Sequence, residues 1–295
     1  MHNLSYPVTD IHVHIQPWQQ LHPSAQAVMS FGRPDYENLA AMMNDPAAVL
    51  ARMDADGIDR IGMINYVAPR LMGFTDDVND WCARISKADP RRLLAFGGLD
   101  PRDPAVIKNP AAAVDRLVDL GIRGLKIHPP HQELKANAYR KGAAEEYLPA
   151  LEGIYGRLQE VKMPLMIHTG TSVFPGARSR YGDPMDCDDI GIDFPELKMI
   201  LAHCGRPMWA QGAIFIIRRF PDAYIDLSSI PPKRLLHYIP MLEKLANKCL
   251  WGTDWPGPGA PTMDHNVIEF LKLDLSEEAC KLILHDNAAT LFPYP

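Results

Sequence analysis

Short apolar segments rich in β-branched residues alternate with amphipathic segments along the whole chain. Segments of the first kind are 8–14, 58–66, 93–99, 122–127, 164–168, 198–203, 222–227 and 248–253. Their length and composition predict buried β-strands. The stretches between them carry helix signals, such as Asp45 and Asn109, each of which precedes a proline and favours an N-cap. Eight strand–helix units in this order predict a parallel sheet that is covered by helices.

Eight such units are the number that closes a (β/α)8 TIM barrel, so we predict one barrel domain over residues 1–295. An open doubly wound sheet is the alternative. It would need a glycine-rich phosphate loop after the first strand, but the chain reads HVHIQP at 12–17. We find no internal repeat or linker in the sequence that would divide the chain.

Two connections are longer than simple turns. Residues 15–44 follow the first predicted strand, and residues 169–188 follow the fifth. Both leave their strands at the carboxyl end, which is the face where barrel enzymes have their active sites. We therefore expect lids or substrate walls, with ordinary surface insertions as the alternative.

Composition restricts the partners and the location that we expect. The chain has 30 Lys and Arg against 36 Asp and Glu, a formal net charge of -6, which argues against a nucleic-acid partner. No apolar run approaches the roughly 18 residues of a membrane span, and the first residues lack the order of a signal peptide. Five scattered cysteines argue against a disulfide framework. We expect a cytoplasmic enzyme with a small-molecule substrate and no membrane partner, and a homo-oligomer stays open.

Four histidines and one aspartate lie at the carboxyl ends of predicted strands. His12 and His14 end the first strand, His168 the fifth and His203 the sixth, whereas Asp254 follows the eighth. These strand ends converge on one small volume in a barrel, and residues two apart in a strand share a face. Imidazole and carboxylate are ligands of Zn²⁺, Mn²⁺ and Fe²⁺. The pattern predicts one divalent metal ion, although any of these histidines taken singly could be a core residue.

Four segments resemble the signatures of the amidohydrolase superfamily. They are 9–14 (TDIHVH), 166–170 (MIHTG), 201–205 (LAHCG) and 251–256 (WGTDWP). More narrowly, the chain is similar to the amidohydrolase-2 branch, which contains aminocarboxymuconate-semialdehyde decarboxylase, resorcylate-type decarboxylases, and lactone and amide hydrolases. The resemblance extends from residue 9 to residues 287–288 and implies a (β/α)8 barrel with one divalent metal, usually zinc.

The resemblance also implies roles for these residues. His12, His14, His168 and Asp254 would be metal ligands, and His203 would be a ligand or the polar group beside the metal. A divalent metal lowers the pKa of bound water from about 15.7 toward 7. Asp254 would then accept a proton as the catalytic base, and His203 would polarise the substrate oxygen.

These roles define three functional hypotheses. We expect a metal-dependent hydrolase that uses activated water on a small lactone, amide or ester, cyclic or carboxylated. The first alternative is a metal-dependent non-oxidative decarboxylase of an aromatic or muconate-type acid, because the same groups can protonate a ring carbon. The second is a barrel that binds a metal or ligand without turnover.

Other residues near the strand ends are candidates for metal or substrate binding. Lys126 and His128 end the fourth predicted strand. In other parts of the superfamily a lysine there is carboxylated and bridges two metals. Lys126 could also contact a substrate carboxylate or pair with an acid. The candidate substrate-binding residues on the mouth loops, for which surface or packing roles are the alternative, are Arg206, Arg178, Arg180 and Trp255.

Cys204 follows His203 directly and could be a nucleophile or a thiolate ligand. If it continues the sixth strand, its side chain points away from His203 and toward the helices. We therefore expect Cys204 to be a core residue.

Overall fold

The computed structural model of the chain describes residues 2, 4–257 and 259–294. Its strands form one eight-stranded parallel sheet in which each strand pairs with the next along the sequence. The strands are β1 (Thr9–Val13), β2 (Arg60–Met63), β3 (Leu93–Gly97), β4 (Gly124–Ile127), β5 (Leu165–His168), β6 (Met199–Ala202), β7 (Ala223–Asp226) and β8 (Cys249–Leu250). Each strand lies inside one of the segments that the sequence predicts as strands.

Hydrogen bonds between the two ends of the sheet close it. The Ile11 amide donates to the Trp251 carbonyl at 2.9 Å, and the Asp254 amide donates to the His12 carbonyl at 2.9 Å. The protein is therefore a (β/α)8 TIM barrel, which confirms the fold that the eight strand–helix units predict.

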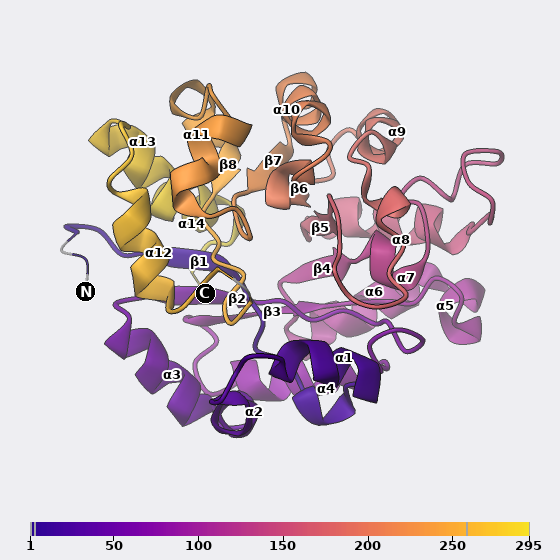
Figure 1. Cartoon of the computed structure of the whole chain (residues 1–295). Helices are drawn as coiled ribbons and strands as arrows, with labels where there is room; N and C mark the ends of the chain where they lie inside the picture. Colours follow the sequence, from indigo (N-terminus) through magenta and orange to yellow (C-terminus); the bar gives the residue numbers. More distant parts are fainter. Residues whose placement is uncertain (1, 3, 258, 295) are drawn as a thin grey trace.

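Helices surround the strands as an outer ring (Figure 1). They are α1 (Pro23–Ser30), α2 (Tyr36–Met43), α3 (Pro46–Ala55), α4 (Asp77–Ser86), α5 (Pro104–Lys108), α6 (Pro110–Leu120), α7 (Pro129–Gln132), α8 (Ala150–Glu160), α9 (Asp186–Asp193), α10 (Ala210–Arg219), α11 (Leu235–Tyr238), α12 (Met263–Phe270), α13 (Glu277–Lys281) and α14 (Asn287–Leu291). The predicted N-caps are confirmed, because the Asp45 and Asn109 side chains accept hydrogen bonds from first-turn amides of α3 and α6. Among the described residues, no helix is both long and apolar enough to cross a membrane.

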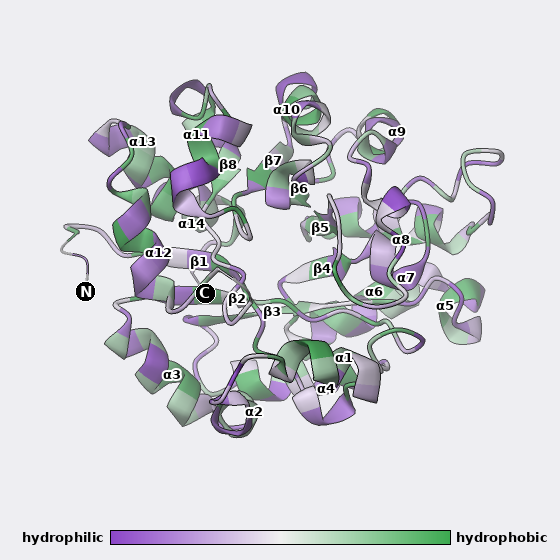
Figure 2. Ribbon diagram, in the orientation of Figure 1, coloured by the Kyte–Doolittle hydropathy of each residue, from purple (hydrophilic) through white to green (hydrophobic). Residues whose placement is uncertain are grey.

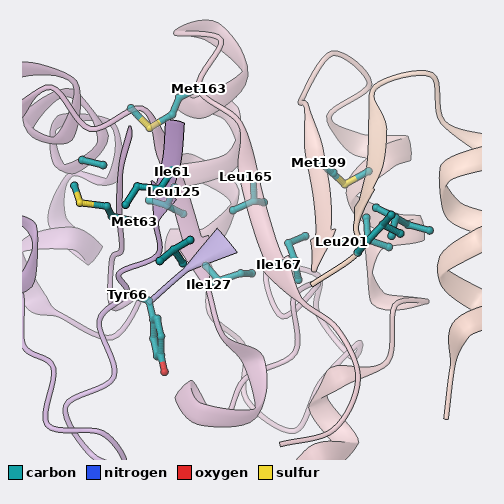
Figure 3. Close-up of a cluster of buried hydrophobic side chains, with 14 of the residues drawn as sticks. Ile61, Met63, Tyr66, Leu125, Ile127, Met163, Leu165, Ile167, Met199 and Leu201 are labelled. Atoms are coloured by element: carbon teal, nitrogen blue, oxygen red, sulfur yellow. The ribbon is translucent and has the colours of Figure 1, made fainter. Parts of the chain in front are cut away.

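Alternation along the strands divides the apolar core into two layers. In β5, Leu165 and Ile167 belong to the outer cluster, which includes helix residues, whereas Met166 belongs to the inner cluster. Figure 3 shows part of the outer cluster, with Leu165 and Ile167 beside Met199 and Leu201 of β6. Helices such as α10 carry both hydrophobic and hydrophilic residues in Figure 2, as expected for helices with one buried face.

The inner layer is apolar at the amino ends of the strands. Ala288 and Leu291 of α14, with Phe292, pack there against interior residues such as Phe96. The next inward position of β5 beyond Met166 is His168. The histidines that end β5 and the neighbouring strands therefore lie at the carboxyl ends of the strands, at the mouth of the barrel.

Candidate metal centre

His12 is fully buried in β1, beside an irregularity of strand register between Asp10 and Val13. Its Nδ1 lies 2.5 Å from Oδ2 of Asp226, the last residue of β7. Its Nε2 is 3.3 Å from Asp254 Oδ1 and has no hydrogen-bond partner among the residues described. Because Nδ1–H donates to the carboxylate, Nε2 keeps its lone pair. A carboxylate that accepts a hydrogen bond from the other ring nitrogen in this way orients metal-binding histidines in proteins.

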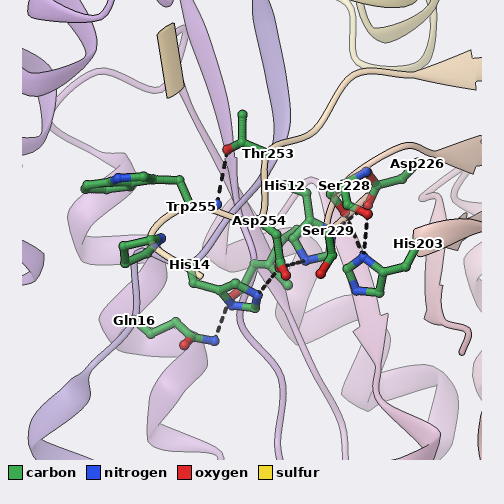
Figure 4. Close-up of polar contacts among 12 residues, drawn as sticks. His12, His14, Gln16, His203, Asp226, Ser228, Ser229, Thr253, Asp254 and Trp255 are labelled. Atoms are coloured by element: carbon green, nitrogen blue, oxygen red, sulfur yellow. Dashed lines mark hydrogen bonds and ion pairs between the residues drawn. The ribbon is translucent and has the colours of Figure 1, made fainter. Parts of the chain in front are cut away.

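His203 and Asp254 approach His12 from two other strands (Figure 4). One potential ligand atom from each of the three residues lies within 4.8 Å of the other two. His203 Nδ1 is 3.1 Å from the Ser228 carbonyl oxygen, so it carries the proton and leaves Nε2 free to act as a ligand. Burial lowers the pKa of both histidines, which keeps them in the neutral form that binds metals.

His14 and His168 border this group of three. His14 Nε2 is 2.8 Å from Asp254 Oδ1, and the two rings of the His12–His14 pair are 5.1 Å apart. The His168 ring lies 4.7 Å from the His203 ring, and its buried Nε2 has no hydrogen-bond partner in the described part of the chain. Burial also lowers the pKa of His168. The structure thus brings all five residues of the predicted metal site to one end of the barrel.

The turn that carries Asp254 is fastened to β1. The buried Asp10 carboxylate accepts hydrogen bonds from the Thr253 amide at 3.0 Å and the Thr253 hydroxyl at 2.6 Å. Asp254 has a φ of 66°, in the left-handed region, which aspartate adopts more readily than most residues. A Cβ at Gly252 would lie 2.5 Å from Asp226 Oδ1, so glycine is required for this close approach.

The donor set fits a divalent cation. Burial raises the pKa of Asp254, but the hydrogen bond with His14 and the nearby His12 and Arg206 outweigh this effect and hold the pKa well below its ordinary range. The group therefore offers an ionised carboxylate and neutral imidazoles, which are ligands of Zn²⁺, Mn²⁺ and Fe²⁺. Buried acceptors without partners cost free energy, and a bound cation would satisfy the lone pairs on His12 and His168.

A cavity of about 310 Å³ leads from solvent to these residues. Both long connections contribute to its walls, as the sequence predicts. The connection 15–44 contributes Leu21, Val28, Met29, Phe31 and Arg33. The connection 169–188 contributes Thr171, Ser172, Val173 and Phe174. The outer walls are mainly apolar, whereas the deep end is lined by histidines.

Cationic side chains outnumber carboxylates on the cavity wall. Among the described residues that line it, Asp254 is the one carboxylate, and the cations are Lys126, Arg206 and Arg33. Lys126 is 1% exposed, and burial lowers its pKa to about 8, so it remains mostly charged at neutral pH. Arg206 donates to the Thr171 carbonyl at 3.0 Å and to the Ser229 hydroxyl at 2.6 Å. The balance of charge favours an anionic ligand.

Two predicted substrate residues, Arg178 and Arg180, lie outside the cavity wall that the described residues form. Their side chains are 56% and 58% exposed, and they pair with Glu133 and Glu145 at 2.9 and 3.2 Å. Trp255 is 3% exposed and packs in the outer core instead of lining this cavity. The sequence places these residues near the mouth, but it does not show the acids and core positions that take up their side chains.

Lys126 and His128 both line the cavity. The Lys126 Nζ and His128 Nδ1 atoms are buried without hydrogen-bond partners in the parts of the chain described. The His128 ring stacks on the His168 ring at 3.8 Å, and burial lowers its pKa well below the ordinary value. These positions allow the metal or substrate roles that the sequence suggests.

Cys204 is buried in the core, as expected, but not because it continues the sixth strand and points away from His203. β6 ends at Ala202, and the next residues form a turn in which His203 and Cys204 have φ values of 67° and 51°. This left-handed turn separates the two side chains. Burial raises the pKa of the Cys204 thiol to about 12, so it stays protonated.

Two residues that hold the ligand histidines were not singled out from the sequence. Asp226 fixes His12, and the carbonyl of Ser228 fixes His203. The signal for Asp226 is its position at the end of the seventh predicted strand, where a carboxylate faces the same volume as the histidines. The Ser228 hydroxyl also lies 2.9 Å from His203 Nδ1, and its signal in the sequence is a polar residue two positions after the seventh strand.

Comparison with known families and solved structures identifies the family of the chain. The amidohydrolase family model matches residues 9–294, so the chain belongs to the amidohydrolase family. An uncharacterized TIM-barrel protein, Bb4693 from Bordetella bronchiseptica, is 22% identical with a TM-score of 0.74, and the match covers 97% of this chain and 98% of that chain.

Two further solved structures share the barrel. Dihydroorotase from Campylobacter jejuni is 16% identical with a TM-score of 0.56, over 99% of this chain and 86% of that chain. A phosphotriesterase homology protein from Escherichia coli, solved with phosphate in its active site, is 14% identical with a TM-score of 0.60. The match covers 97% of this chain and 98% of that chain. At these identities the likeness establishes the fold. Membership of the family makes the chain an amidohydrolase-type enzyme, and such enzymes usually depend on a metal.

Proposed function

We propose that this protein is a metal-dependent hydrolase that adds water to a small, cyclic, carboxylated lactone, amide or ester. The observation that carries the proposal is the group formed by His12, His203 and Asp254, whose ligand atoms lie within 4.8 Å of one another at the deep end of a cationic cavity. A divalent ion bound there would polarise a carbonyl oxygen and lower the pKa of a water molecule. His14 and His168 are proposed as the remaining ligands.

The residues of the chain have separable tasks in this proposal. Asp254 is ionised and lies against His12 and His14, so it can bind the cation and take up a proton from attacking water. His203 carries its proton on Nδ1, so the lone pair of its Nε2 would help to hold the cation, and the cation would polarise the substrate oxygen that gains negative charge. Each task requires the side chain to be held before substrate arrives, which the buried contacts achieve.

Arg206 is proposed to hold the carboxylate of the substrate. Its two Nη atoms are occupied by the Thr171 carbonyl and the Ser229 hydroxyl, whereas its buried Nε has no partner among the described residues. Those contacts fix the guanidinium plane on the cavity wall, and Lys126 adds a second positive charge. The apolar outer walls suit the faces of a ring.

The test combines a substrate panel with two variants of metal-replete protein. Lactones that carry a carboxylate should release a proton on turnover and the corresponding amides should release an amine, and Asp254→Asn should reduce turnover by about 10²–10⁴-fold with the metal retained. Arg206→Gln should raise KM for the carboxylated substrate about tenfold or more, but not for its methyl ester. Arg116→Gln, which changes a surface ion pair with Asp76, is the matched control.

The panel also separates the alternatives. Release of carbon dioxide from hydroxylated aromatic acids, without hydrolysis of any lactone or amide, would refute the proposal in favour of a decarboxylase. Near-normal turnover by Asp254→Asn on a verified substrate would refute its role as the base.

A further inference from the structure

Three side chains on the cavity wall form a hydrogen-bonded chain that the proposed reaction does not use. The Tyr66 hydroxyl is 2.8 Å from His131 Nδ1, and His131 Nε2 is 2.8 Å from the Ser172 hydroxyl. All three residues line the cavity. Tyr66 and His131 are 2% and 3% exposed, whereas Ser172 lies half-buried in the long connection after β5.

The His131 ring is rigidly held between its neighbours. It stacks on the His128 ring at 3.5 Å and meets the Phe174 ring edge-on at 5.1 Å. The short helix α7 that carries it is anchored by Gln132, whose side chain donates to the Val67 carbonyl at 2.9 Å. Burial lowers the pKa of His131 to about 3, so its imidazole is neutral and carries one proton.

Counting protons gives the chain a direction. Tyr66, neutral His131 and Ser172 carry three polar protons, and the two hydrogen bonds use two of them. The third proton remains at one end of the chain. If Tyr66 kept it, a buried hydroxyl proton would lack an acceptor, which costs about 1–3 kcal/mol. Tyr66 therefore donates to His131 Nδ1, and His131 Nε2–H donates to Ser172.

This direction leaves the Ser172 O–H as a free donor at the cavity wall. The other contact of its oxygen is with the Phe174 amide, which donates to it at 3.3 Å, so the oxygen already accepts two hydrogen bonds. The hydroxyl proton is then available to an acceptor in the cavity. Thr171, the neighbour of Ser172, accepts from Arg206, so the donor lies close to the proposed carboxylate site.

We propose that Ser172 is a specificity-determining residue that donates a hydrogen bond to a second acceptor oxygen on an anionic ring substrate, and that Tyr66 and His131 are positioning residues that fix its direction. This inference rests on the proposed anionic substrate and names a further feature of it, namely a carboxylate or carbonyl oxygen apart from the carboxylate held by Arg206. It needs no turnover, so binding alone can test it.

The experiment measures binding of benzoate, phthalate, isophthalate and terephthalate to metal-replete protein by calorimetry. At least one dicarboxylate should bind the wild-type protein about tenfold more tightly than benzoate, the usual effect of a hydrogen bond to a charged acceptor. Ser172→Ala should remove this preference and leave benzoate affinity within about twofold. Ser172→Thr, which keeps the hydroxyl, should retain it.

Tyr66→Phe should lose part of the preference, because Ser172 can then turn its proton back toward His131 Nε2. The double variant that combines Tyr66→Phe with Ser172→Ala should lose no more of the preference than Ser172→Ala alone, since both changes act on one donor. Ser30→Ala is the matched control, because the Ser30 hydroxyl donates to the Ala27 carbonyl at 3.4 Å and Ser30 is not among the described residues that line the cavity. It should keep the preference.

Each contrary result has a distinct meaning. The inference is overturned by a preference that survives Ser172→Ala, by a preference that is lost equally in Ser30→Ala, or by losses that multiply in the double variant. The inference is also overturned if no dicarboxylate is preferred by the wild-type protein. Failure of benzoate itself to bind would refute the anionic substrate class of the proposed function, and the inference with it.

Discussion

Replacement of Asp226 by asparagine tests how the metal centre is built. Asp226 is completely buried, and its two oxygens serve different donors. Oδ2 accepts from His12 Nδ1 at 2.5 Å, and Oδ1 accepts from the Ser228 amide at 2.8 Å. Asparagine has the same shape but a single oxygen, so Asp226→Asn leaves one of these donors facing an NH₂ group.

Either orientation of the new amide harms the site. If its oxygen faces Ser228, its NH₂ group faces His12 Nδ1 and drives the proton to Nε2, which removes the lone pair proposed to bind the metal. If its oxygen faces His12, the buried Ser228 amide loses its acceptor and the negative charge that makes imidazole a better ligand is still absent. We expect metal affinity to fall about 10- to 100-fold, or ~1.4–2.7 kcal/mol.

The assay is a competition titration of apoprotein against a zinc-binding dye, with thermal unfolding of the apoprotein measured alongside. Asp188→Asn is the matched control, because Asp188 pairs with Arg219 at the surface at 2.8 Å. Its affinity should equal that of the wild-type protein. If the zinc affinity of folded Asp226→Asn were within twofold of the wild-type value, His12 would not depend on Asp226 for metal binding. The proposed role of Asp226 in positioning His12 would then be wrong.

Three further predictions concern the fold and the site. Gly252→Ala should lower the free energy of unfolding in urea by about 1–3 kcal/mol, because its Cβ would lie 2.5 Å from Asp226 Oδ1. His14→Ala should weaken metal binding in dialysis with unchanged apoprotein circular dichroism, since this side chain is 21% exposed. Burial raises the pKa of Asp186 to about 6 from 3.8, so its contribution to stability is present below pH 4 and lost as the pH rises through 6. Asp186→Asn should flatten that part of the profile of melting temperature against pH, and an unchanged profile would contradict the assignment.

The sequence predicts the barrel and the ring of histidines because both follow from strand periodicity. Residues two apart share a face, and parallel strands in a barrel end at one mouth, so His12, His14 and His168 could be placed together before any contact was known. Each predicted strand segment contains an observed strand. The sixth strand was predicted one residue too long at its carboxyl end because His203 adopts a left-handed conformation that ends regular pairing.

The contacts that position the candidate metal ligands could not be predicted from the sequence in the same way. The contact between His12 and Asp226 joins residues 214 positions apart, and its geometry depends on the closure of β8 against β1. The candidate substrate residues Arg178 and Arg180 failed to reach the cavity for a related reason. Their partners, Glu133 and Glu145, lie on other segments, and nothing local in the sequence pairs them.

The buried polar atoms that lack partners indicate what the cavity is built to hold. Within the described residues, five of them lie on its wall: three are ring nitrogens that can accept, His12 Nε2, His168 Nε2 and His128 Nδ1, and two are donors, Lys126 Nζ and Arg206 Nε. Each costs about 1–3 kcal/mol, a large share of a typical stability of 5–15 kcal/mol. Acceptors of this kind are satisfied by a cation and donors by an anion. These opposite requirements within one cavity support the proposal that it binds a metal ion and an anionic substrate together.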